Sequence, residues 1–466
     1  MIVSDVIIFL PGISGSVLRK DGKTLWGTDL GGVWGMLTSG GDSIRSLALT
    51  HGDDPSADDI DGIEATALVP DLHLIPGLWK IDGYTKVSKH LVRELTLKPG
   101  ENFFEFPYDW RRDNRVASRK LGRFARSKLA AWRESSGKKD ARLVFVVHSM
   151  GGLVARGFMD GPDQGWVDTR ALITIGTPHR GSLNALGYIA NGFSKRVGPV
   201  KFDLSDTLRS FTGLYQLLPH YEVIDRGDGH LLRVDETAGL PHLDPDRAKA
   251  AMQFYQELED WQNGVKALPT YAATAPRWYP ITGTFQPTEQ SARFDGQTLT
   301  LLKSRHDEDQ DGDGTVPRIS AMPIQLQQSS AGMFADQVHA SLQNDDAVLN
   351  QVVALIKGLG LDYGLRAEFT KVALLVDDVY VAGAPVVVRA KTNPSVASLT
   401  LALFDARRPA DEDAGRLGEI TLYDRGDEWL VGEVNLDEGA YRIVVADAAN
   451  ITPAADCFLV IADDNG

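Results

Sequence analysis

Ser149 is the residue of this chain whose surroundings best suit nucleophilic chemistry. It lies in Val147-His-Ser-Met-Gly151, directly after an apolar run and before a stretch with a helical pattern. A serine on a sharp turn between a strand and a helix is the arrangement of a nucleophile elbow. Such a turn favours small residues two positions before and two after the serine, which Gly151 provides and Val147 does not. The pattern predicts a serine nucleophile; the alternative is a buried serine that ends a strand.

A serine hydroxyl attacks only when a histidine takes its proton, and a carboxylate must hold that histidine. In α/β-hydrolases the chain order is serine, acid, histidine. His339 is the only histidine that follows Asp313, so it is the predicted base. Asp313, in Gln310-Asp-Gly-Asp-Gly-Thr-Val316, is the predicted orienting acid, and Asp311 is a less favoured substitute.

The spacing Asp309-x-Asp311-x-Asp313-Gly314 also suggests a calcium loop. Such a loop requires a glutamate at its twelfth position, where this chain has Ser320, and it requires flanking helices, which the pattern lacks. No HExxH motif or Cys/His cluster indicates zinc. We therefore expect no metal and no cofactor.

Acyl transfer also requires two preorganised donors for the oxyanion. The Met150 N–H, next to the serine and at the start of a helix, is one candidate. The Ile13 N–H, in the glycine-containing turn Pro11-Gly-Ile-Ser-Gly-Ser16, is the other. The alternative for this turn is a tight connection without a catalytic role.

The elements that must position these residues alternate between strands and helices. Such alternation predicts a mostly parallel sheet with helices on both faces, which is the α/β-hydrolase class. Short apolar runs predict core strands, and helical periodicity predicts helices over 115–133, 246–262 and 347–359. The predicted strands are Val6–Leu10, Phe103–Phe106, Leu143–Val147, Ala171–Ile175, Tyr279–Thr282 and Met322–Leu326.

The same pass along the chain divides it into two predicted domains. Residues 1–365 are expected to form the α/β-hydrolase catalytic domain, with an irregular insertion at about 20–100, which carries Trp26, Trp34 and Trp79, and a cap at about 185–275. After about 365, short apolar runs separated by Gly, Asp and Pro predict an all-β sandwich over 366–466. This accessory domain is a candidate surface for a protein partner.

Composition limits the classes of function. A formal charge of −15 opposes a general nucleic-acid binder, because neutralising phosphates requires clustered Lys and Arg. The single cysteine, Cys457, excludes an intramolecular disulfide framework and favours a reducing compartment. No secretory signal precedes the first apolar run, and no run is long enough to cross a bilayer. These features predict a soluble, cytoplasmic protein.

Five segments of the chain resemble the lecithin:cholesterol acyltransferase-like family, which includes lysosomal phospholipase A2 and phospholipid:diacylglycerol acyltransferases. The resemblance implies acyl-ester chemistry on lipids, with Ser149, Asp313 and His339 as triad and Ile13 and Met150 as oxyanion donors. The chain differs from the family at Val147 and lacks the disulfides of the secreted members. The resemblance does not cover the chain after about residue 365. The segments are Leu10–Ser16, Pro107-Tyr-Asp-Trp-Arg111, His148-Ser-Met-Gly-Gly152, Gly176-Thr-Pro-His-Arg-Gly-Ser182 and Asp311-Gly-Asp-Gly-Thr-Val-Pro317.

The sequence thus predicts a lipase or phospholipase that forms an acyl-enzyme intermediate. Hydrolysis is favoured because water is always present, while transfer to an alcohol acceptor, a short-chain esterase and a catalytically weak binding or regulatory module remain alternatives. Apolar residues of the cap are predicted to line an acyl groove, unless they are ordinary core. These residues are Phe211, Leu214, Tyr215, Leu217 and Leu218.

One segment is basic, although the net charge of the whole chain is negative. Residues 111–142 contain 12 basic and 3 acidic residues, a local excess of +9. A basic amphipathic helix can dock on an anionic membrane, so this stretch raises peripheral membrane contact as a hypothesis. The alternative is the solvated face of a helix. The residues that would make the contact are Arg119, Lys120, Arg123 and Arg126.

Overall fold

The computed structural model describes most of the chain in a series of ranges. These are 3–27, 42–50, 52–70, 73–75, 79–197, 200–324, 333–358, 371–393, 395–408, 415–425, 429–445 and 454–462. Trp34 of the predicted insertion lies outside them, as does the predicted domain boundary at 365/366.

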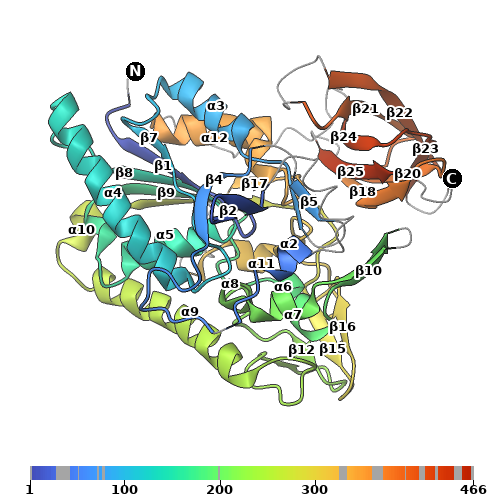
Figure 1. Ribbon diagram of the computed structural model, residues 1–466, viewed down its shortest axis with the longest axis horizontal. Coiled ribbons are helices and arrows are strands. Elements are labelled where there is room, and N and C mark those ends of the chain that lie inside the picture. The colour runs from blue at the N-terminus through green and yellow to red at the C-terminus, as the bar shows by residue number, and fades with distance from the viewer. Residues whose placement is uncertain are drawn as a thin grey trace.

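A six-stranded parallel sheet forms the centre of the N-terminal part (Figure 1). Its strand order is β17-β14-β9-β8-β1-β7. The inner strands are continuously apolar because helices bury both faces of the sheet, which is why short apolar runs located them in the sequence. The strands are β1 (Val6–Leu10), β7 (Phe103–Glu105), β8 (Leu143–His148), β9 (Thr169–Ile175), β14 (Arg277–Gly283) and β17 (Met333–Ala335).

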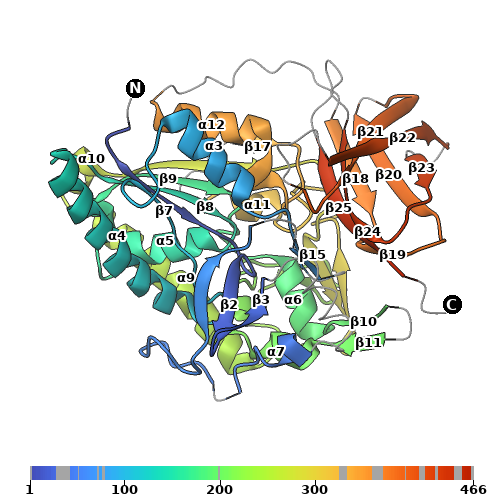
Figure 2. The same cartoon turned by 45° about the horizontal axis from the view of Figure 1, so that its top comes forward.

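Two sets of helices cover the two faces of this sheet. On one face α3 (Thr85–Leu95) and α12 (Asp346–Ile356) share a core with alternate residues of β1 and β8. On the other face lie α4 (Asn114–Ser136), α5 (Gly151–Asp160) and α9 (Pro245–Lys266). Figure 2 shows both layers with the sheet between them. The predicted α/β-hydrolase class is confirmed.

The ends of α4 follow local rules. The Asp113 carboxylate accepts a hydrogen bond from the Arg115 N–H and caps the first turn, and Gly137 ends the helix with a φ of 71°. The predicted strand at 322–326 is wrong in its described part, because Met322–Ile324 lie in no strand and the sixth strand is Met333–Ala335. Ile324 is 44% exposed, so this apolar run does not enter the buried core of the sheet.

Small elements surround the central sheet. The predicted insertion at 20–100 contributes β3 and β4, which flank β2 in an antiparallel sheet, the antiparallel pair β5 and β6, and a short helix. In the predicted cap, short helices accompany a sheet that residues after β14 complete as β15 and β16. These elements are β2 (Ser16–Lys20), β3 (Lys23–Trp26), α2 (Asp42–Arg45), β4 (Glu64–Leu68), β5 (His73–Ile75), β6 (Trp79–Ile81), α6 (Leu183–Ala190), β10 (Ser194–Val197), β11 (Val200–Asp203), α7 (Ser205–Ser210), α8 (Thr212–Tyr215), β12 (Ile224–Asp225), β13 (Leu231–Leu232), α10 (Tyr271–Thr274), β15 (Ser291–Phe294), β16 (Leu299–Leu302) and α11 (Arg318–Ala321).

The C-terminal segment is all-β, as predicted, and its strands are hydrogen-bonded into one sheet with the order β18-β20-β23-β22-β21-β24-β25-β19. The sheet curls around an apolar core of its own, which includes Val372, Leu401 and Phe458. Figure 1 shows this sheet in orange to red beside the α/β part, with β25 on the side that faces the α/β part. The strands are β18 (Lys371–Val376), β19 (Val379–Val381), β20 (Val386–Asn393), β21 (Ser398–Asp405), β22 (Arg416–Asp424), β23 (Leu430–Val434), β24 (Gly439–Val445) and β25 (Ala455–Ile461).

None of the helices in the described ranges combines the length and the apolar character needed to cross a bilayer.

Candidate active site

Ser149 occupies the turn between β8 and α5 in a strained backbone conformation. Its φ is 51°, a left-handed value that side-chain-bearing residues rarely adopt. The turn is tight on its helical side, since a Cβ at Gly151 would lie 2.5 Å from the Pro11 carbonyl oxygen. Val147 belongs to the apolar core and is fully buried there, so this position accepts a branched residue.

The side chains of Ser149, His339 and Asp313 form one chain of hydrogen bonds. The distance from His339 Nε2 to Ser149 Oγ is 2.9 Å, and the distance from His339 Nδ1 to Asp313 Oδ2 is 2.7 Å. Asp313 is buried, and its second oxygen accepts from the N–H groups of Thr315 and Val316 at 3.0 and 2.7 Å. This geometry can remove a proton from the serine and stabilise the resulting imidazolium.

Of the two acids that the sequence left open, Asp313 contacts the histidine. Asp311 turns its Oδ1 toward the N–H groups of Phe285 and Gly312. Asp309 accepts from the side-chain amide of Gln290 and from the Asp311 N–H. The carboxylates of the calcium-like motif are therefore used in shaping this loop.

A second network, which the sequence did not reveal, surrounds the nucleophile. The Tyr84 hydroxyl accepts from the Gly12 N–H at 3.0 Å and lies 3.0 Å from His148 Nδ1. His148 Nε2 is 3.1 Å from the His339 carbonyl oxygen. Burial lowers the pKa of His148 well below its usual range, and the neighbouring His339 lowers it further. A neutral His148 that carries its proton on Nε2 satisfies both contacts.

The predicted oxyanion donors flank the serine. Ile13 lines the cavity that contains Ser149, and Met150 lies at the N-terminus of α5, where the helix dipole favours negative charge. The two turns approach closely, because a Cβ at Gly12 would lie 2.8 Å from the Ser149 Cβ. Within the described ranges neither the Ile13 N–H nor the Met150 N–H donates to another protein group.

Ser149 and His339 open into a cavity of about 320 Å³, at the small end of the range for ligand pockets. Leu214 and Leu217, both predicted to contact substrate, line it. The other predicted substrate residues lie in the core and do not line the cavity. Phe211 packs edge-on against Trp110, the Tyr215 ring lies under the Arg247 guanidinium, and Leu218 is fully buried. The helical spacing of apolar residues in the cap sequence does not distinguish residues that line the cavity from residues that lie in the core.

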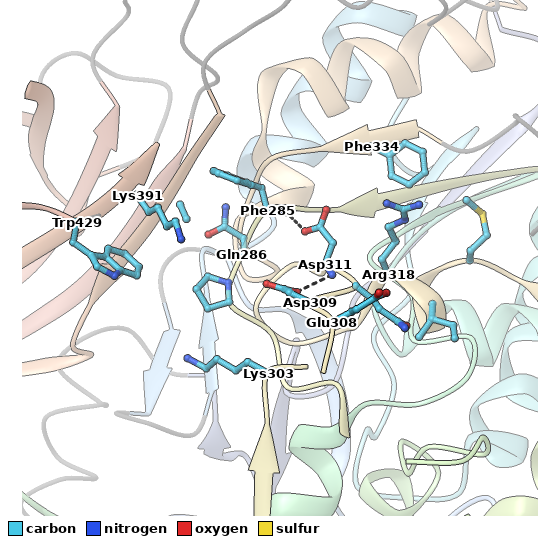
Figure 3. A pocket seen from close by; sticks show the side chains of 15 residues that line it. Phe285, Gln286, Lys303, Glu308, Asp309, Asp311, Arg318, Phe334, Lys391 and Trp429 are labelled. Atoms are coloured by element: carbon cyan, nitrogen blue, oxygen red, sulfur yellow. Dashed lines mark hydrogen bonds between the residues drawn. The ribbon is translucent and has the colours of Figure 1, made fainter. Parts of the chain in front are cut away.

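A second cavity, of about 980 Å³, lies between the loop 308–311 and the C-terminal sheet (Figure 3). Lys391 of β20 and Trp429, which directly precedes β23, face Gln286 across it. The loop that carries Asp313 separates the two cavities, because Asp309 and Asp311 line the larger one and Asp313 lines the smaller one.

The lecithin:cholesterol acyltransferase family model matches residues 77–237. The resemblance to this family is thereby confirmed. The matched segment includes Pro107–Arg111, the serine turn and Gly176–Ser182, whereas Asp313, His339 and the C-terminal sheet lie outside it. Enzymes of this family are acyl-ester hydrolases or acyltransferases, and the match supports that class of activity for the chain.

The other comparisons are more distant. No curated protein matches the sequence. Among solved structures, the mature Bacillus licheniformis lipase BlEst2 is 10% identical, covers 76% of this chain and 92% of its own, and has a TM-score of 0.30. The Legionella pneumophila phospholipase PlaB is 10% identical over 98% of this chain and 92% of its own, with a TM-score of 0.32. Similarities this weak do not bear on activity.

The basic residues predicted to contact a membrane lie on α4 among carboxylates from other parts of the chain. Arg123 pairs with Asp58 at 2.5 Å, and Arg119 lies 3.9 Å from the same residue. Lys120 lines a small crevice with several aspartates, and Arg126 lies within 3.6 Å of two more. The positive excess counted along the sequence is therefore largely offset in space.

Proposed function

We propose that this protein is a serine hydrolase that cleaves lipid acyl esters through an acyl-enzyme intermediate. Ser149 is the nucleophile, His339 the general base and Asp313 the residue that orients the imidazole. The observation that carries the proposal is the continuous hydrogen-bonded path from Ser149 Oγ through His339 to a buried Asp313. The family match supports the lipid ester as the substrate class.

The proposed reaction has two halves. His339 Nε2 takes the hydroxyl proton as Ser149 Oγ attacks the ester carbonyl, and the Ile13 and Met150 N–H groups receive the oxyanion. The imidazolium then protonates the leaving alcohol, which departs and leaves the acyl group on the serine. A water molecule, activated by the same imidazole, releases the fatty acid and regenerates the hydroxyl.

A fluorophosphonate probe tests whether the site is chemically competent. We expect covalent labelling of the wild-type protein at Ser149 and none in Ser149→Ala. The variant Ser14→Ala is a matched control, because Ser14 lies in the same cavity and has no proposed role in the chemistry. Absence of labelling in a folded wild-type protein would reject the enzyme and favour a binding or regulatory module.

A chain-length series of p-nitrophenyl esters tests the lipid claim. Preference for medium or long acyl groups supports a lipase, since Leu214 and Leu217 line an apolar part of the cavity. Preference for acetate or butyrate indicates a short-chain esterase instead. Adding a long-chain alcohol and measuring wax-ester product separates an acyltransferase from a hydrolase.

Two further proposals concern membrane contact and location. Peripheral membrane contact through α4 stays a hypothesis, because acidic neighbours surround Arg119, Arg123 and Arg126. Salt-sensitive binding to anionic vesicles that is lost when these residues and Lys120 are neutralised would support the hypothesis, and unchanged binding would reject it. We also propose a location in the cytoplasm, because a single cysteine, Cys457, favours a reducing compartment.

A further inference from the structure

The C-terminal sheet reaches the proposed active site, although the family match does not include this part of the chain. Asp378, between β18 and β19, and Asp456 of β25 are among the residues that line the cavity containing Ser149. Alternate side chains of β25 also belong to the apolar core that includes β8 and the cap. These side chains are those of Cys457, Leu459 and Ile461. The sheet is therefore packed against the α/β part beside the loops that carry the proposed triad.

One edge of β25 is only partly covered by a neighbouring strand. β24 pairs with β25 from Ala455 to Val460, whereas β19 pairs on the other edge only from Leu459 to Ile461. Backbone N–H groups of alternate residues point toward the same edge of a strand. The Leu459 N–H donates on the β19 side to the Asp378 carbonyl oxygen, so the Ala455 N–H, an even number of positions away, points the same way. Ala455 thus presents an edge donor that the paired strands do not use.

The side chain of Gln337 accepts this donor. Its Oε1 receives the Ala455 N–H at 3.3 Å and the Val338 N–H at 2.9 Å. Gln337 is 3% exposed and lies between the end of β17 and His339. One buried oxygen therefore joins β25 to the backbone immediately before the proposed base. A buried N–H that lost this acceptor would have to find another, which would move the loop.

Backbone hydrogen bonds also hold the loop at the base and after it. The His339 N–H donates to the Asp313 carbonyl oxygen at 2.8 Å, and the Ala340 carbonyl oxygen accepts from the Asp82 N–H at 3.1 Å. The Asp82 carboxylate in turn contacts the Arg442 guanidinium of β24, and both side chains are less than a tenth exposed. The loop is thus attached to the C-terminal sheet on both sides of His339.

We propose that Gln337 is a positioning residue for the proposed hydrolysis, through which the C-terminal sheet holds the His339 imidazole against Ser149. This inference rests on the proposed function, because it takes His339 as the base. Gln337 is not among the described residues that line the cavity, so it acts on the base and not on the substrate. A displacement of the imidazole by about 1 Å can lower the rate on the order of 100-fold.

Two variants remove the hydrogen bond from its two ends. Gln337→Met keeps the length of the side chain and removes the acceptor. Ala455→Pro removes the donor at the first residue of a strand, a position that tolerates proline. We expect each variant to lower kcat and the rate of fluorophosphonate labelling at least about tenfold, with KM changed less than about twofold. The double variant should be no slower than the slower single variant, because both changes remove the same interaction.

Two further variants separate positioning from a general loss of stability. Gln337→Glu keeps an acceptor oxygen and should recover most of the labelling rate, since Lys86 and Arg442 line the same crevice and tolerate a negative charge there. Asn102→Leu is the matched control, because Asn102 is 2% exposed and accepts the Lys98 N–H at 2.8 Å. It precedes β7, at the end of the sheet opposite to the catalytic loops. Asn102→Leu should lower the urea midpoint and leave labelling unchanged.

The outcomes distinguish this inference from the proposed function. Labelling at the wild-type rate in folded Gln337→Met or Ala455→Pro would overturn the inference and leave the proposed function intact. An equal loss of labelling in Asn102→Leu would overturn it as well, because the effect would then follow stability. If one of the two bond-removing variants does not fold, the other decides by the same criterion. A folded wild-type protein that is not labelled at all would overturn both proposals.

Discussion

Replacing Tyr84 by phenylalanine removes one hydroxyl that serves two groups at the proposed site. The side chain is 1% exposed and packs between Phe9 and His148. Its hydroxyl is the partner of the Gly12 N–H and of His148 Nδ1, each at 3.0 Å. Phenylalanine keeps the ring contacts and removes only these two interactions.

The size of the effect follows from the burial of the groups left behind. A buried donor or acceptor that loses its partner costs about 1–3 kcal/mol, so the two together should lower the free energy of unfolding by about 2–6 kcal/mol. Activity should fall as well, because Gly12 precedes the proposed oxyanion donor and His148 holds the backbone of His339. A small displacement of either group predicts a loss of about 10- to 100-fold in kcat, with KM little changed.

Denaturant unfolding measures the free energy of unfolding, and the rate of fluorophosphonate labelling measures the loss of reactivity at Ser149. Tyr221→Phe is a matched control, because Tyr221 is also buried, while its hydroxyl has no hydrogen-bond partner among the residues that the structure describes. Removing an unpaired hydroxyl should change the free energy of unfolding by less than about 0.5 kcal/mol. If the two variants lose the same stability and the same labelling rate, the network around Tyr84 does not hold the site.

Three further predictions concern other parts of the molecule. Gly12→Ala places a Cβ 2.8 Å from that of the nucleophile and should abolish labelling, whereas Gly264→Ala, with open space around it in α9, should leave labelling unchanged and stabilise the protein by about 1 kcal/mol. Burial raises the pKa of Asp160 from 3.8 to about 7, so the folded state binds its proton more tightly than the unfolded chain. The free energy of unfolding should therefore fall by up to about 4 kcal/mol as the pH rises from 4 to 7. Asp160→Asn should flatten this pH dependence, measured by urea titration at each pH. If the variant shows the same pH dependence as the wild-type protein, groups other than Asp160 cause it. Arg442→Met should cost about 3–5 kcal/mol by leaving the Asp82 carboxylate buried alone, and adding Asp82→Leu should recover part of it; equal losses in the single and double variants would contradict this.

Local patterns in the sequence identified most of the central sheet. Val6–Leu10, Leu143–His148 and Thr169–Ile175 are short apolar runs because their strands are covered on both faces, and the prediction located each within two residues. The run at Met322 misled the same reasoning, because an apolar run does not by itself show that its side chains are buried, and Ile324 is 44% exposed.

Chain order located the residues that meet at the candidate site, because composition left one histidine after Asp313. It could not supply the groups around them. Tyr84 and Gly12 are 72 positions apart, and a hydrogen bond between them depends on how α3 packs against the sheet. The contribution of Asp378 was equally hidden, because it depends on how two separately patterned parts of the chain pack together.

Trapping the acyl-enzyme tests the central claim most directly. The protein is mixed with a lipid ester, quenched in acid within milliseconds and digested, and the peptide that contains residue 149 is weighed by mass spectrometry. The account predicts an acyl adduct on Ser149 that disappears as fatty acid is released, and no adduct in Ser149→Ala. Steady hydrolysis by the Ser149→Ala variant, or an adduct on another residue of the wild-type protein, would contradict it.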